Sequence, residues 1–152
     1  MKYKGMICPE QIEECTAAFD VFTEQAGLKQ KSRLRLRLLL EELLLIYRDS
    51  LGEETAFELC LKEKRGDIKV SLSVDGKEMN PMQEPSPILC RILQDHYETP
   101  EWSYSGGRNN VQIVIPVYNT LLKNIRLSWK YMEGQRSTFV LAVTSQLVSV
   151  CL

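Results

Sequence analysis

The residues of this sequence that could take part in catalysis or ligand binding are a few acidic and amide side chains and several glycines. Glu41 and Glu42 lie together in a leucine-rich stretch, where a glutamate could act as a general base on water. Asp75 and Gly76 follow an apolar run, and Asn80 comes shortly after them. An acid and an amide in such a loop can bind a ligand, although Asp-Gly and Asn-Pro pairs first of all form turns.

A second group of candidate residues lies closer to the C-terminus. Gly106 and Gly107 are adjacent, and paired glycines allow a backbone to approach a phosphate. Trp102 and Tyr104 precede them and could stack on a base, or pack a loop against a sheet. His96 could shuttle protons, but a lone histidine without a nucleophile or metal ligand at a recognisable spacing is most often structural.

Several chemistries are excluded by what the sequence lacks. The five cysteines are scattered with no Cys-x-x-Cys pair, which argues against a metal site and fits a reducing, cytoplasmic setting. No nucleophile elbow, P-loop or zinc-protease motif occurs. Nineteen basic and twenty acidic side chains give a formal net charge of -1, so we expect no nucleic acid as a partner.

Two helices are expected to position the first candidates. A proline start, apolar residues at helical spacing and a glycine stop predict a helix over 9–27. Leucines and glutamates predict a second helix from Ser32, as its cap, to about Ser50. Arg37 stands four residues before Glu41, which favours a salt bridge between them. The basic stretch 29–37 could contact phosphates or a partner's acidic surface, but its alternation with leucines favours a solvated helix face.

The remaining segments indicate a sheet. Strict alternation predicts strands at 55–62 and 68–74 with a hairpin turn between them, and places Phe57, Leu59 and Leu61 on one face. The other expected elements are a short strand before Pro9, a short helix at 88–97, a glycine-rich loop at 100–110 and a strand at 111–115. The fold class is therefore α+β, a two-layer sandwich with two main helices on one face of an antiparallel or mixed sheet.

The end of the chain differs from the rest. Its first half, after residue 117, has the apolar spacing of an amphipathic helix with basic and aromatic residues, and residues 137–152 carry no charged side chain. This order is typical of the start of a membrane segment, although a bilayer-spanning helix needs about 20 apolar residues. A buried terminal helix or strand is the alternative. We therefore divide the chain into a domain at 1–117 and a helical tail at 118–152 that could contact a membrane.

The helix with Glu41-Glu42, the hairpin and the run Val74-Asp75-Gly76-Lys77-Glu78-Met79-Asn80-Pro81 together resemble the histidine-kinase-like (GHKL) ATPases. The small anti-sigma-factor kinases are the most similar type. In that family a helix carries an acid and, four residues on, an asparagine that holds magnesium, while an aspartate-x-glycine turn binds adenine. The resemblance covers residues 1–117. The pocket residues that it implies are Asp75, Gly76, Asn80, Gly106 and Gly107, with Glu42 as the catalytic base if the site is active.

The sequence departs from this family at two positions. Four residues after the two glutamates stand Leu45 and Ile46, which have no lone pair for magnesium. Alignment on Gly76 puts Val74 in the place of the adenine-binding aspartate, and sliding the register to use Asp75 replaces the glycine by a lysine. Loss of a hydrogen bond to a charged acceptor costs about 1.5 to 3 kcal/mol. We therefore expect weak or absent ATP binding and no cofactor.

Similar domains of this family precede bacterial membrane transporters, and Glu41-Glu42, Trp102-Ser103-Tyr104 and Arg108-Asn109 are similar to that subgroup. The resemblance implies a noncatalytic regulatory or protein-interaction domain, the cytoplasmic part of a transporter at the inner face of the plasma membrane. Its partner would be a protein or an adjoining membrane domain, with a homodimer left open. The alternatives are an active serine kinase of the anti-sigma type that uses ATP and magnesium, and a free-standing soluble structural domain whose tail packs on itself.

Overall fold

Five strands and three helices make up the part of the chain that the structure, a computed structural model, describes: residues 1–64, 66–94 and 100–117. In chain order they are β1 (Lys2–Met6), α1 (Pro9–Gln25), α2 (Gln30–Leu51), β2 (Ala56–Lys64), β3 (Asp67–Asp75), α3 (Pro87–Gln94), β4 (Glu101–Ser105) and β5 (Arg108–Pro116). The predictions made for His96 and for the tail at 118–152 lie outside the described residues. None of the helices within the described ranges has the length and apolar character needed to cross a bilayer.

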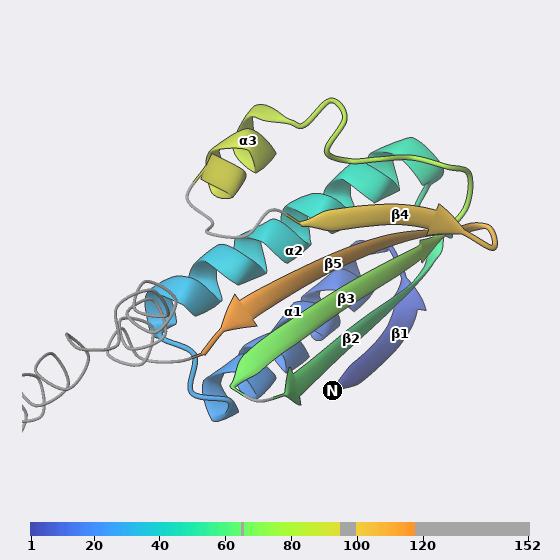
Figure 1. The fold of residues 1–152 in the computed structure, drawn as a ribbon. Coiled ribbons are helices and arrows are strands. Elements are labelled where there is room, and N and C mark those ends of the chain that lie inside the picture. The colour runs from blue at the N-terminus through green and yellow to red at the C-terminus, as the bar shows by residue number, and fades with distance from the viewer. Residues whose placement is uncertain (65, 95–99, 118–152) are drawn as a thin grey trace, which may run out of the picture. The chain divides into compact units, whose positions relative to one another are not determined.

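The strands form one antiparallel sheet in the order β1-β2-β3-β5-β4. Helices α1 and α2 run side by side along one face of this sheet, and α3 lies near α2 and β4 (Figure 1). The expected α+β fold, with two main helices covering one face of the sheet, is therefore confirmed, and every strand pairing in it is antiparallel.

The connection between α1 and α2 explains why the second helix begins earlier than expected. Gly27 has a φ of +79°, and the N–H groups of Gly27 and Leu28 donate to carbonyls of the last turn of α1. These bonds end the helix and reverse the chain. Leu28 is buried directly after the turn, so that α2 starts at Gln30. Ser32 consequently lies inside the first turn of α2, and the prediction that it caps the helix is wrong.

Residues 100–110, expected as a glycine-rich loop, instead form strand β4 and the start of β5. Gly106 and Gly107 have φ values of +59° and +75° and connect Ser105 to Arg108, which are paired across the two strands. Two consecutive positive φ values are typical of the two-residue turns of β-hairpins. Strand β4 lies at the edge of the sheet and is mostly exposed, so its sequence lacks the alternation that predicts a strand.

The core lies between the helices and the sheet. The expected alternation in β2 is confirmed, because Phe57, Leu59 and Leu61 are 3%, 0% and 1% exposed. The face of α2 that meets them is almost entirely aliphatic. Its buried residues are Leu36, Leu39, Leu40, Leu43, Leu44 and Tyr47.

Two leucines of α2 provide a test of this arrangement. Leu43 is 1% exposed and Leu38 is 53% exposed. We expect Leu43→Ala to lower the free energy of unfolding by about 2–5 kcal/mol, because it leaves a cavity under α2. Leu38→Ala should change it by less than about 0.5 kcal/mol. Urea unfolding followed by circular dichroism measures both, and equal losses would contradict the assignment of the buried face of α2.

Candidate functional site

The two candidate glycine segments meet at one end of the sheet. Asp75 is the last residue of β3 and pairs in register with Arg108, the first residue of β5. The Gly76 N–H donates to the Gly107 carbonyl oxygen at 3.0 Å, and the Tyr104 hydroxyl donates to the Gly76 carbonyl oxygen at 3.2 Å. The structure therefore brings together five of the residues named in the sequence analysis, at the point where β3 leaves the sheet (Figure 1).

The carboxylate of Asp75 has a partner within the chain. Its Oδ1 lies 2.6 Å from Nε of Arg108, and both side chains are about half exposed. An exposed ion pair of this kind adds little to stability, typically less than about 1 kcal/mol. It nevertheless occupies a carboxylate oxygen, so that an incoming amino group would compete with the Arg108 guanidinium for Asp75.

Val74 occupies the position at which the resemblance expects an adenine-binding acid. Its side chain is 0% exposed and belongs to the hydrophobic core, and it is paired with Phe57 on one side and Asn109 on the other. A carboxylate in its place would be buried among aliphatic side chains at a high desolvation cost. The core position therefore requires an apolar residue in this protein.

The glycine at 76 is required by its conformation and by its surroundings. Its φ is +134°, a region that side chains other than glycine rarely adopt. A Cβ atom there would lie 3.2 Å from Cδ1 of Leu51 at the end of α2. Gly76 thus fixes how closely the loop after β3 passes α2.

Asn109 anchors the loop that follows Gly76, and the sequence analysis missed this role. Its side chain is 0% exposed. Its Oδ1 accepts the Met79 N–H and its Nδ2 donates to the Lys77 carbonyl oxygen, both at 2.8 Å. The sequence did contain a signal for this role. Asn109 alternates with Val111 and Ile113, so that it shares the inward face of β5 with them. An amide on such a face needs hydrogen-bond partners.

Asn80 has a local role in the same loop. Its Oδ1 accepts the N–H of Met82 at 2.9 Å, across Pro81. A side chain that bonds the backbone two residues on forms an Asx turn. In this structure Asn80 therefore shapes the chain between β3 and α3.

Both glutamates of α2 are paired with residues of this chain. Glu41 Oε1 lies 2.8 Å from Nε of Arg37, whose guanidinium also contacts Asp20 at 2.6 Å, so the expected pairing with Arg37 is confirmed. Hydrogen bonding to Glu41, together with the charge of Asp20, raises the pKa of Arg37. Glu41 is thus part of a contact between α1 and α2.

Glu42 is fixed to the start of α3 through Ser86. The Ser86 hydroxyl donates to Glu42 Oε1 at 2.5 Å, and its oxygen accepts the Leu89 N–H at 3.0 Å. Ser86 is therefore the N-cap of α3, with Pro87 at the first helical position. This link was not predicted, although Ser-Pro before an apolar run is a sequence signal for a helix start.

A pair of buried polar groups lies between α2 and β4. The Tyr47 hydroxyl and the Trp102 indole nitrogen are buried, and within the described residues neither has a hydrogen bond of good geometry. Burial raises the pKa of Tyr47, and Trp102 is close enough to oppose this effect. Trp102 therefore packs into the molecule rather than standing free for a base to stack on it.

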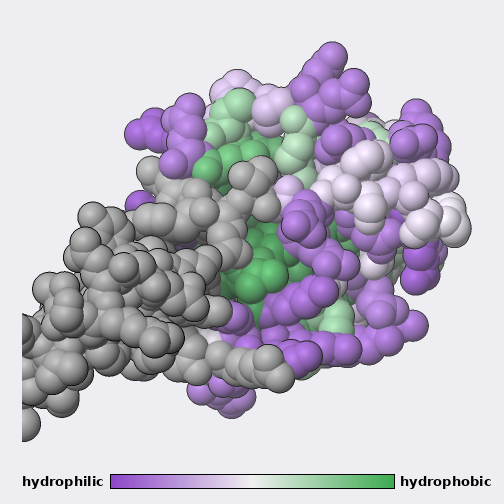
Figure 2. All heavy atoms as spheres, in the orientation of Figure 1, coloured by the Kyte–Doolittle hydropathy of each residue, from purple (hydrophilic) through white to green (hydrophobic). Residues whose placement is uncertain are grey.

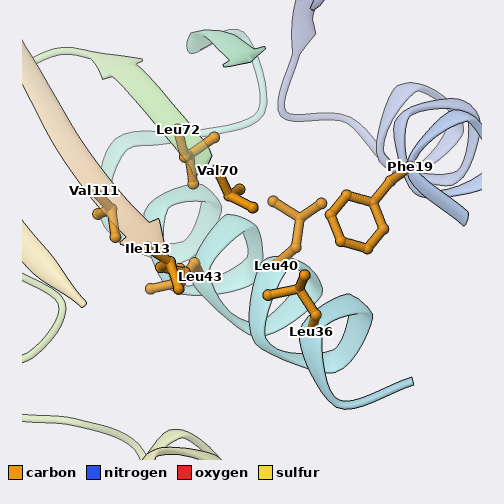
Figure 3. Close-up of a pocket in the computed structure, with 8 residues that line it drawn as sticks. All are labelled: Phe19, Leu36, Leu40, Leu43, Val70, Leu72, Val111 and Ile113. Carbon is orange, nitrogen blue, oxygen red and sulfur yellow. The ribbon is translucent and has the colours of Figure 1, made fainter. Parts of the chain in front are cut away.

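The space between α2 and the sheet is filled. A cavity of about 10 Å³ remains there, in contact with α1, α2, β3 and β5 (Figure 3). Its lining consists of Phe19, Leu36, Leu40, Leu43, Val70, Leu72, Val111 and Ile113. Pockets for ligands of nucleotide size measure about 300–1,000 Å³, so this cavity is too small for a nucleotide.

The described residues contain no group of three or more His, Cys, Asp and Glu side chains placed to hold a metal ion. At the positions where the resemblance expects the magnesium-holding amide, Leu45 and Ile46 are partly buried, and Ile46 packs against the core. Neither side chain can coordinate a hard cation, which takes oxygen ligands.

Comparisons with known proteins give a distant likeness among solved structures. No family model and no curated protein match the chain. Among solved structures, it is similar to the catalytic domain of the histidine kinase ThkA in a nucleotide-free form. The identity is 15% and the TM-score 0.47, over 76% of this chain and 97% of that chain. A likeness at this level assigns no family and no function.

The anchor formed by Asn109 can be tested against its neighbour. Asn109→Ala removes both hydrogen bonds to the loop, and we expect it to lower the free energy of unfolding by about 1–3 kcal/mol. It should also speed amide exchange at Met79. Asn110→Ala removes a hydrogen bond to Ser73 at a half-buried site and serves as the matched control. Unchanged exchange at Met79 in Asn109→Ala would contradict the anchoring role.

Proposed function

We propose that this chain is a noncatalytic regulatory or protein-interaction domain built on a degenerate histidine-kinase-like fold. The observation that carries the proposal is that the candidate ligand-binding groups interact with this chain itself. Asp75 is paired with Arg108, Glu42 with Ser86, and the Asn80 amide with the backbone of its own turn. A site built for nucleotide would instead present such groups to the ligand.

The element order supports the same proposal. A long helix that carries Glu41 and Glu42, a hairpin and an Asp-Gly turn follow one another in the order that the resemblance implies, with a further helix and a last strand after them. The aliphatic residues Leu45, Ile46 and Val74 stand where that family has polar ligands. The scaffold is thus retained in this proposal, while the chemistry of nucleotide binding is lost.

The proposal includes a place for the domain in the cell. The basic and aromatic residues of 118–136, followed by the uncharged run at 137–152, support a domain that adjoins a membrane protein on the cytoplasmic side. A transporter is the partner that we propose, in line with the resemblance. The alternative, an active serine kinase, would require Glu42 to be released from Ser86 when nucleotide binds.

The proposed loss of nucleotide binding is tested by calorimetric titration of the full chain with ATP and magnesium. We expect no saturable heat up to 1 mM ligand, and no shift of the unfolding midpoint. A site with a dissociation constant of about 10 μM would stabilise the fold by about 2.7 kcal/mol at that concentration. Micromolar, magnesium-dependent binding that is lost in Asp75→Ala would contradict the proposal and support the kinase. Asp75→Ala itself should fold normally, because its ion pair is exposed.

The proposed association with a membrane is tested by fractionation. Residues 1–117 form a compact unit with its own core, so a chain truncated after Val117 can be compared with the full chain. We expect the full chain to stay with carbonate-washed membranes and the truncated chain to remain in the supernatant. If the full chain is found in the supernatant and truncation lowers its unfolding midpoint, the tail packs on the domain and the membrane proposal is wrong.

A further inference from the structure

An open groove runs between α2 and α3. It has a volume of about 520 Å³. Its lining residues are Arg35, Leu38, Pro87, Ile88, Arg91 and Ile92. Figure 2 shows hydrophobic surface over α3. Of the described residues that line the groove, four are thus apolar and two are arginines.

The exposed apolar side chains of this groove are unusual in their grouping. Leu38 is 53% exposed and Ile88 is 61% exposed, and Leu34, one turn before Leu38, is 53% exposed. A single exposed leucine is ordinary on a protein surface. Apolar side chains gathered on two helices around a concave surface are typical of a site that binds a partner.

The groove is held in shape without a ligand. Leu89 of α3 is 0% exposed and belongs to the core. Ser86 caps the helix and is bonded to Glu42 of α2. Because α3 is fixed at its buried residue and at its N-terminus, Ile88 is kept on the outer side. A preformed surface loses little conformational entropy on binding.

The charge of the groove selects among occupants. Among the described residues that line it, two are arginines and none is acidic, and Arg35 already has an interaction within the chain. Arg91 is exposed and makes no ion pair with any residue in the described ranges. The first half of the chain's own tail carries Lys123, Arg126, Lys130 and Arg136. These like charges disfavour that segment as the occupant, whereas carboxylates would be attracted.

The shape of the groove further limits which partners could bind there. A bilayer surface is flat on this scale and would not fill a groove between two helices. The described residues that line the groove offer arginine donors but no side-chain acceptor for the amino groups of a base. A helix with one apolar face fits a groove of this kind, with side chains at i, i+3 or i+4, and i+7 as its anchors.

We infer that the α2–α3 groove binds an acidic amphipathic helix of a partner protein, with apolar residues on Leu38, Ile88 and Ile92 and a carboxylate on Arg91. This rests on the proposed function, since it names the surface and the partner chemistry of an interaction domain. It does not depend on whether the partner is a transporter.

Selection of helical peptides from a random library on the immobilised full chain tests this inference. We expect the recovered peptides to place Leu, Ile or Phe at helical spacing and to be rich in Asp and Glu. Their affinity should fall at least tenfold for Ile88→Ser and for Arg91→Glu. Val21→Ser, at a residue of α1 that is 55% exposed, is the matched control and should leave affinity unchanged. Unchanged unfolding midpoints confirm that all three variants fold.

A charge exchange makes the test specific. Replacing one acidic residue of a selected peptide by lysine should weaken binding to the natural chain and restore binding to Arg91→Glu. Recovery of no peptide, peptides without acidic enrichment, or binding that is indifferent to both groove substitutions would overturn the inference. Displacement of the peptide by ATP and magnesium would show that the groove is an anion site and would also overturn it.

These outcomes separate the inference from the proposed function. If neither nucleotide nor peptide binds, the inference that the groove binds a helix is wrong, while the proposal that the domain has lost nucleotide binding stands. If nucleotide binds without displacing the peptide, the proposal that ATP binding is lost is wrong, while the inference that the groove binds a helix stands.

Discussion

The packing of one aliphatic helix face against the sheet is the constraint on which the rest of this structure depends. Helix α2 buries leucines over β3 and β5, and the cavity that they line there measures about 10 Å³. Burial of this kind, at about 25 cal/mol per Å² of apolar surface, fixes the rotation of α2. The rotation in turn directs Glu42 toward Ser86 and so sets the position of α3. The position of α3, and with it the α2–α3 groove, follows from this packing.

Several polar residues hold the fold together through contacts within the chain. Asn109 is buried and holds the loop after β3, Asp75 meets Arg108 across the sheet end, and Ser86 links α2 to α3. Satisfied polar groups of this kind are the rule in protein interiors. Each of them could also have contacted a ligand, and each is already engaged. Within the described residues, exposed apolar side chains are instead found around Ile88 and Leu38.

The sequence predicted those elements whose periodicity is strong. Alternation in β2 and leucine spacing in α2 identified the core, and the i to i+4 spacing identified the Arg37–Glu41 pair. Strand β4 was missed because an exposed edge strand has no buried face to produce alternation. The contacts of Glu42 with Ser86 and of Asp75 with Arg108 join segments distant in sequence. Local pattern cannot show which of two partners, a ligand or another side chain, a carboxylate will meet.

The most direct test of the account is a nuclear magnetic resonance titration of the labelled full chain with ADP and magnesium. The amide signals of Gly76 and Gly107, at the end of the sheet, and of Ile46, on α2, report on the place where the resemblance puts a nucleotide. The account predicts that these three signals stay unchanged at millimolar ligand. Saturable shifts of all three at micromolar ligand, dependent on magnesium, would contradict it.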